Sequence, residues 1–134
     1  GDVIILSLYD DAAVSATLDQ MLTMRLTDKL IVDTSTVLPT LLTGQMAEIS
    51  AAGAQAVDAP ISGGPELVAA GSCGIFIGGE ASAAGRAEAA LSAISNRIFH
   101  VGPLGTGLVM KTVNNAMLQV YMNGLTELMP LAKP

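Results

Sequence analysis

The sequence has no tryptophan, few other aromatic residues (3%), one cysteine and one histidine. A single cysteine, Cys73, excludes an internal disulfide, and a reducing intracellular environment is the expected one. Because no histidine or second cysteine lies near it in the sequence, Cys73 is predicted to be a buried strand residue, and no metal site is predicted. The histidine, His100, is predicted at the end of a strand, with catalysis by its imidazole as the alternative.

Basic residues are also scarce. Six Lys and Arg residues stand against twelve Asp and Glu residues, so the net charge of −6 argues against nucleic acid as a partner. No apolar run reaches the roughly 18 residues that a membrane span needs, and no signal peptide is visible. The predictions are therefore no membrane segment and a cytoplasmic location, or the mitochondrial matrix in a eukaryote.

Hydrophobic residues make up 51% of the 134 residues, which is enough for one domain with a substantial core. Apolar runs alternate with helical patterns, and this alternation predicts an α/β fold with a parallel sheet. The connection between residues 58 and 73 is short for a crossover helix, so one late strand is expected to run antiparallel. The pattern predicts strands at 2–8, 29–33, 54–58, 73–79 and 97–102, and helices at 11–22, 39–52, 81–94 and from 105 onwards.

Three consecutive strand ends carry hydroxyl groups, glycines or a turn. Leu8 and Tyr9 follow the first strand, Thr36 follows the second, and the Ser62–Gly64 turn follows the third. Because the carboxyl ends of parallel strands meet at one edge of a sheet, these residues are expected to line one rim. The hydroxyl and open backbone amides of the turn suit a carboxylate. The alternatives are an ordinary turn at 62–64 and a helix N-cap at 33–36.

The last helix carries a charged group in apolar surroundings. A glycine-rich turn at 102–107 opens it, and Lys111 is the only charged side chain between residues 104 and 126. Asn114 and Asn115 fall on the same helix face as Lys111. An ammonium on an apolar helix is costly unless it is paired or useful, which indicates a site. The alternative is that the lysine extends past the apolar surface to water.

Four motifs occur in order: VDTSTVLP (32–39), DAPISGG (58–64), GGE (78–80) and GPLGTGLVMKTVNN (102–115). Together they resemble the β-hydroxyacid dehydrogenase family, the group of 3-hydroxyisobutyrate dehydrogenase, tartronate semialdehyde reductase and, more distantly, 6-phosphogluconate dehydrogenase. The resemblance covers nearly the whole chain and implies an internal fragment. Residues 1–104 would be the C-terminal part of a Rossmann-type dinucleotide-binding domain, and residues 105–134 an interdomain helix leading into a missing all-α domain.

The resemblance implies an oxidoreductase that transfers a hydride between NAD or NADP and a small β-hydroxyacid, and a homo-oligomer in the full-length protein. The substrate would resemble 3-hydroxyisobutyrate or tartronate semialdehyde and would carry a carboxylate. The implied roles are acid/base catalysis by Lys111, substrate orientation by Asn115, carboxylate binding by Ser62, Gly63 and Gly64, and contact with the nicotinamide half of the cofactor by Leu8, Tyr9 and Thr36.

The sequence also departs from the family pattern. The glycine fingerprint that binds the cofactor pyrophosphate is expected to precede Gly1, so the 134 residues alone are expected to be inactive. Tyr9 replaces a commoner proline, and residues 65–68 are bulkier and more acidic than usual, which leaves the substrate open. The alternative function is a non-catalytic, dehydrogenase-derived scaffold or oligomerisation module, which has no reason to keep Lys111 and Asn115.

Overall fold

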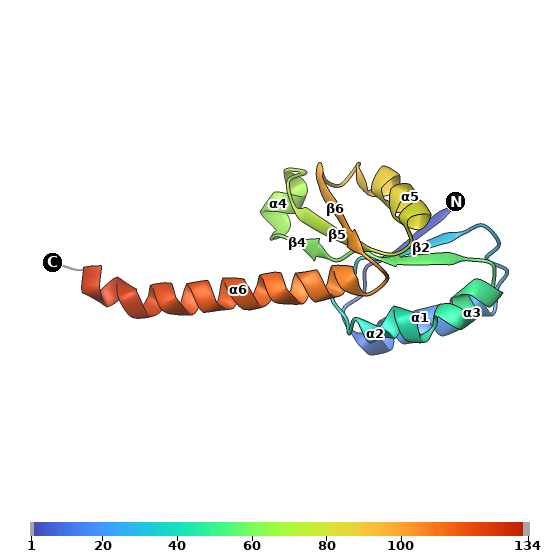
Figure 1. Cartoon of the computed structure of the whole chain (residues 1–134), viewed down its shortest axis with the longest axis horizontal. Helices are drawn as coiled ribbons and strands as arrows, with labels where there is room; N and C mark the ends of the chain where they lie inside the picture. The colour runs from blue at the N-terminus through green and yellow to red at the C-terminus, as the bar shows by residue number, and fades with distance from the viewer. Residues whose placement is uncertain (1, 133–134) are drawn as a thin grey trace.

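The computed structural model describes residues 2–132 and consists of a mixed sheet with helices on both faces and a long final helix (Figure 1). The strands are β1 (Val3–Leu6), β2 (Leu30–Asp33), β3 (Gln55–Asp58), β4 (Ile61–Ser62), β5 (Gly74–Gly78) and β6 (Arg97–Gly102). The helices are α1 (Asp11–Leu22), α2 (Thr40–Gly44), α3 (Met46–Ala51), α4 (Pro65–Ala69), α5 (Ala81–Leu91) and α6 (Thr106–Leu128), followed by a 3₁₀ turn, η1 (Met129–Ala132). The predicted α/β, Rossmann-type architecture is confirmed.

The sheet has the order β1-β2-β3-β5-β4, with β6 paired to the other edge of β5. The first three strands are parallel, whereas β5 runs antiparallel to β3 and β4, and β6 runs parallel to β5. Both late strands are therefore reversed, where the sequence predicted one. The reason is that β3 and β4 pair with one edge of β5, through Asp58–Gly78 and Ser62–Gly74. The chain from β3 to β4 thus continues along β5 and carries the predicted substrate turn with it.

Side chains on both faces of the central strands are buried. Leu30 and Val32 of β2 belong to the cluster under α5, whereas Ile31 belongs to the cluster with α1, α2 and α3. Figure 1 shows α5 on one side of the sheet and α1, α2 and α3 on the other. Burial on both faces explains why these strands read as continuous apolar runs. Cys73 is buried in the α5 cluster directly before β5, in agreement with the prediction of a core residue.

Two predicted elements differ from the structure. The helix predicted to run to residue 52 is broken into α2 and α3 at Gln45, whose backbone leaves the helical region (φ −102°, ψ 6°) and whose N–H bonds to the carbonyl of Leu42. The strand predicted at 2–8 is shorter, and it lies at the edge of the sheet. Ile5 is consequently 45% exposed, because β1 has only β2 beside it in the described part of the chain.

Helix α6 leaves the sheet and projects far beyond it (Figure 1). Within this helix only Gly107 and Leu108, at its beginning, are buried. Apolar side chains farther along the helix are exposed, such as Met117 at 64%. An apolar helix with exposed residues on all sides is typical of an element that packs against further protein. In residues 2–132, no helix combines the length and apolar character needed to cross a membrane.

Candidate active site

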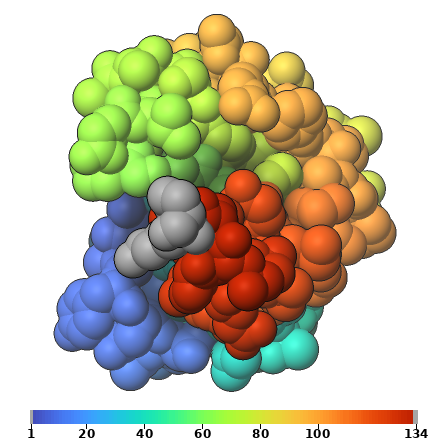
Figure 2. All heavy atoms as spheres, turned by 90° about the vertical axis from the view of Figure 1, so that its left-hand side faces the viewer, coloured from blue at the N-terminus to red at the C-terminus, as the bar shows by residue number. Residues whose placement is uncertain are grey.

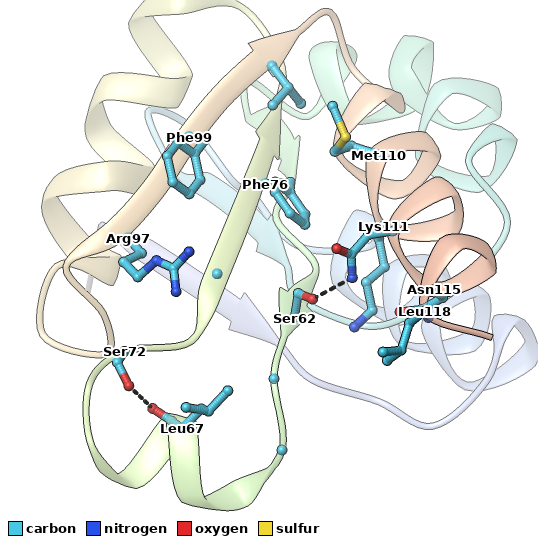
Figure 3. A pocket seen from close by; sticks show the side chains of 15 residues that line it. Ser62, Leu67, Ser72, Phe76, Arg97, Phe99, Met110, Lys111, Asn115 and Leu118 are labelled. Carbon is cyan, nitrogen blue, oxygen red and sulfur yellow. Dashed lines mark hydrogen bonds between the residues drawn. The ribbon is translucent and has the colours of Figure 1, made fainter. Parts of the chain in front are cut away.

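A pocket of about 890 Å³ lies between the open face of β4–β5–β6 and the beginning of α6 (Figure 3). Phe76 of β5 and Phe99 of β6 stack on this face with their ring centroids 6.2 Å apart. In Figure 2, viewed along α6, the green segment with β4 and α4 and the orange segment with β6 lie side by side next to the helix. The predicted substrate and catalytic residues all line this pocket: Ser62, Gly63, Gly64, Lys111 and Asn115, together with Asn114.

Two hydrogen bonds join α6 to the segment that carries the predicted carboxylate site. The Lys111 ammonium donates to the carbonyl oxygen of Ile61 at 2.6 Å, and the Asn114 amide donates to the Ser62 hydroxyl oxygen at 3.0 Å (dashed in Figure 3). Asn115 also lines the pocket, and the substrate-orienting role that the resemblance implied for it stays a prediction. The helix face predicted for Lys111 therefore meets the 62–64 turn directly.

The backbone at Gly63 requires glycine. Its φ of +140° lies in a region that side-chain-bearing residues rarely adopt. A Cβ there would also lie 3.2 Å from the side chain of Leu67 and 3.3 Å from Cβ of Cys73. Since Gly63 and Gly64 carry no side chains, the turn lines the pocket with backbone beside the Ser62 hydroxyl, a composition that suits a carboxylate.

The Lys111 side chain is partly buried, and within residues 2–132 it forms no ion pair with a carboxylate. Burial lowers the pKa of Lys111 below its usual range, because the charged form loses hydration. The neutral carbonyl of Ile61 orients the ammonium but does not neutralise it. Lys111 can therefore attract an anion into the pocket, and it releases its proton more readily than an exposed lysine.

None of the residues predicted to contact the nicotinamide half lines this pocket. The backbone N–H of Leu8 donates to the hydroxyl of Ser35 at 2.9 Å, which joins the loops after β1 and β2. Tyr9 and Thr36 in these loops are both exposed, Tyr9 at 87%. The loops after β1 and β2 are thus joined to each other, whereas the 62–64 turn, expected on the same rim, lines the pocket with Lys111.

Sequence reasoning gave no role to Asp58, the last residue of β3. Its carboxylate is fully buried and accepts from the backbone N–H groups of Gly105 and Leu108, each at 2.7 Å. Burial raises the pKa of the Asp58 carboxyl, and these two hydrogen bonds act in the opposite direction. The available signal was an aspartate closing the apolar strand QAVD, because a carboxylate in such a place needs buried donors.

His100 does not line the pocket. Its Nε2 lies 2.9 Å from the carbonyl oxygen of Gly79 and 3.1 Å from that of Gly102. The imidazole therefore joins the chain segments that follow β5 and end β6, although His100 itself lies within β6, opposite Ile77, rather than at the predicted strand end.

Residues 1–102 match the family described as the NAD binding domain of 6-phosphogluconate dehydrogenase. The chain belongs to this family. It is 34% identical over 132 residues to mitochondrial 3-hydroxyisobutyrate dehydrogenase of Drosophila melanogaster, covering 98% of this chain and 41% of that protein. It is 39% identical over 102 residues to NAD-dependent L-serine dehydrogenase of Pseudomonas aeruginosa, covering 76% of this chain and 34% of that protein.

A solved family member is also similar. The structure of 3-hydroxyisobutyrate dehydrogenase of Mycobacterium tuberculosis with L-serine superposes with a TM-score of 0.91 at 30% identity, covering 98% of this chain and 45% of that one. The chain thus spans less than half the length of these three relatives. The predicted relationship to β-hydroxyacid dehydrogenases and the cofactor class, NAD or NADP, are confirmed at the level of the family. The residue roles and the domain boundary at Leu104 stay predictions.

Proposed function

We propose that this chain supplies the carboxylate-binding and proton-transfer groups of an NAD(P)-dependent β-hydroxyacid dehydrogenase. The substrate class is a small 3-hydroxyacid like 3-hydroxyisobutyrate, or the corresponding semialdehyde in the reverse direction. The observation that supports this proposal is that Lys111 and the Ser62–Gly64 turn line one pocket, with Lys111 held over Ile61.

The substrate carboxylate would bind at the 62–64 turn. Because the Ser62 oxygen accepts a hydrogen bond from Asn114, its O–H remains free to donate to the carboxylate. The backbone N–H groups of Gly63 and Gly64 supply further donors, and Lys111 adds positive charge nearby. Bonds of this kind to a charged group are each worth about 1.5–3 kcal/mol. They would fix the substrate by the end that does not react.

Proton transfer would fall to Lys111. An ammonium has three N–H groups, and one of them is used by Ile61, so two can face the substrate hydroxyl. In the oxidative direction the neutral amine accepts the hydroxyl proton as the hydride leaves the substrate carbon. In the reductive direction the ammonium returns a proton to the developing alkoxide and stabilises its charge. The lowered pKa of Lys111 increases the fraction of the neutral base near neutral pH.

The nicotinamide cofactor supplies the hydride acceptor when it is bound. The described residues fit one half of it. Helix α1 begins with an acidic pair, and Asp10 already caps the N–H of Ala13 at 2.7 Å, which is unfavourable for a pyrophosphate. The exposed Tyr9 and Thr36, on the rim formed by the loops after β1 and β2, carry no charge and suit the nicotinamide and its ribose. We therefore assign the nicotinamide half to this rim.

Cofactor binding distinguishes an enzyme from the alternative function, a non-catalytic scaffold. Titration of the full-length protein that carries this sequence with NADH and NADPH, followed by nicotinamide fluorescence, should show saturable binding. Assays with small 3-hydroxyacids should then show NAD(P)-dependent oxidation. Absence of binding would favour the scaffold. The exposed apolar side chains of α6 support the homo-oligomer that the resemblance implies.

Substitution of Gly64 by valine tests the carboxylate site. Gly64 has an ordinary extended backbone (φ −76°, ψ 174°), and a Cβ would meet only the Glu66 carboxylate at 3.0 Å. The fold should therefore tolerate Gly64→Val, while the branched side chain crowds the pocket. We expect the KM for the hydroxyacid to rise at least about tenfold, since loss of one charge-assisted hydrogen bond is worth that much.

The matched control is Gly85→Val, in α5 away from the pocket, where a Cβ meets nothing within 4 Å. Both variants should keep the melting temperature of the parent protein nearly unchanged. A Gly64→Val enzyme with an unaltered KM would contradict the placement of the carboxylate at this turn.

A further inference from the structure

The segment from Asp58 to Ser62 follows α6 in regular steps. Asp58 accepts from the backbone of residues 105 and 108, Ile61 accepts from the side chain of residue 111, and Ser62 accepts from that of residue 114. Each donor is three residues from the last, so it lies about 60° further round the helix. One five-residue segment therefore holds the helix by a stripe of contacts that winds around it, and the same segment carries the hydroxyl of the candidate substrate site.

The Asp58 end of this stripe is buried and the other end is not. Asp58 has no exposed surface, whereas Asn114 is exposed and Lys111 is only partly buried. Within the described α6, no residue after Leu108 is buried. The place of Lys111 over the pocket therefore depends on how the first turn of the helix is fixed.

Asp58 provides the N-terminal cap of α6 from outside the helix. The N-cap residue, Gly105, has no side chain to cap with, and the first N–H groups of a helix have no partner inside it. The two carboxylate oxygens of Asp58 accept from Gly105 and Leu108 at 2.7 Å, the length of charge-assisted hydrogen bonds. Because these donors lie at different heights and angles on the first turn, the pair of bonds fixes both the rotation and the axial position of the helix.

The space around this carboxylate is closed. A Cβ on Gly107 would lie 2.8 Å from Asp58 Oδ2 and even closer to the carbonyl oxygen of Phe76. A Cβ on Gly78 would lie 2.8 Å from both the N atom of Gly107 and the carbonyl oxygen of Pro103. The first turn is thus pressed directly onto the backbone of β5, and the carboxylate has no alternative partners to turn to.

We infer that Asp58 is a positioning residue, whose carboxylate sets the rotation and height of α6 and thereby places the Lys111 ammonium over Ile61 and the 62–64 turn. Lys111 follows Leu108 by less than one helical turn, so a displacement of the first turn also displaces the Nζ of Lys111. Asp58 does not line the pocket and touches no reacting atom. This inference rests on the proposed acid/base role of Lys111.

The test is Asp58→Asn in the full-length protein. Asparagine keeps the shape and one acceptor oxygen, but its NH₂ group faces one of the two N–H donors. We expect kcat to fall about 10- to 100-fold, as for a displacement of about 1 Å at the reacting groups, with the KM for the cofactor nearly unchanged. The pH–rate profile should show one pKa that belongs to Lys111. This pKa should move up towards that of a free lysine, because water reaches Lys111 more easily when α6 is less firmly held.

The matched control is Ser95→Ala. Ser95 is also buried, and its hydroxyl joins the carbonyl of Cys73 to the N–H of Arg97, away from α6. This variant should lower the melting temperature, while kcat and the pKa of Lys111 in the pH–rate profile stay unchanged. A purely structural role of Asp58 would give the same pattern in Asp58→Asn and would overturn the inference.

Hydrogen exchange gives a readout that does not depend on folding of the variant. In the unsubstituted protein the amides of Gly105 and Leu108 should be protected like those of β5, and rapid exchange of either would overturn the inference. If Asp58→Asn does not fold, the smaller Asp58→Ser carries the same kinetic test. Loss of turnover in Lys111→Ala together with normal kinetics in the Asp58 variant rejects the positioning role alone. Full turnover in Lys111→Ala rejects the proposed function instead.

Discussion

Replacement of Lys111 by alanine is expected to lower turnover by about 10²–10⁴-fold, the usual contribution of a general acid–base group. Cofactor affinity should stay nearly unchanged, because Leu8, Tyr9 and Thr36 do not line the pocket that holds the ammonium. Stopped-flow or steady-state assays of the full-length protein with a small 3-hydroxyacid measure the first quantity, and nicotinamide fluorescence measures the second.

The control for this variant is Lys29→Ala, whose ammonium pairs with Asp2 at 3.1 Å on the surface. An exposed ion pair contributes little to stability, so this variant should keep both activity and fold. Near-normal turnover in Lys111→Ala would remove the acid/base assignment.

The same assignment fixes the sign of the pH dependence. In the oxidative direction the neutral amine is the active form, so kcat/KM should rise with pH through the pKa of Lys111. In the reductive direction the ammonium is active, and kcat/KM should fall over the same interval. Because burial lowers this pKa, both midpoints should lie below that of a free lysine. Midpoints at or above the free value would show that Lys111 is not the titrating group or is fully hydrated.

Gly107→Ala should destabilise the 134-residue chain by about 2 kcal/mol or more, the cost of forcing an extra carbon into a packed backbone contact. The new methyl group would strike the Phe76 carbonyl and the Asp58 carboxylate together. Urea unfolding followed by circular dichroism measures the change in the free energy of unfolding.

Gly124→Ala is the matched control, because it makes the same substitution in the same helix where a Cβ meets nothing within 4 Å. Alanine is favoured over glycine inside a helix, so this variant should be stabilised by up to about 1 kcal/mol. If the two variants were equally stable, the tight contact between the first turn of α6 and β5 would not exist in solution.

The central strands could be predicted from the sequence because burial on both faces leaves one unmistakable signal. Leu30–Asp33 is fully buried, and its first three residues form an unbroken apolar run. The direction of β5 and β6 could be predicted only in part. It depends on which strand β5 pairs with after the chain leaves β3, and the sequence does not show that pairing. The two-residue strand β4 carries too few residues for any periodic signal, although it places the 62–64 turn.

The candidate site shows a similar division. The resemblance in the motifs named Lys111 and the Ser62–Gly64 turn, and the structure places them in one pocket. It assigned substrate orientation to Asn115 and gave no sign of the contact that Asn114 makes with Ser62, although both amides lie on the lysine face. Which of them reaches Ser62 depends on the rotation of α6 about its own axis, and that rotation is set by contacts of the buried Asp58, far away in the sequence.

Helix α6 is also a lever with its pivot at the sheet. Its 23 residues extend about 34 Å from the first turn, whereas Lys111 lies only about 8 Å from it, at 1.5 Å per residue. A sideways displacement at Leu128 is thus reduced about fourfold at Lys111. A catalytic group must keep its position to within roughly 0.5 Å. A protein surface that binds the outer end of α6 therefore needs to limit the sideways displacement of Leu128 only to about 2 Å.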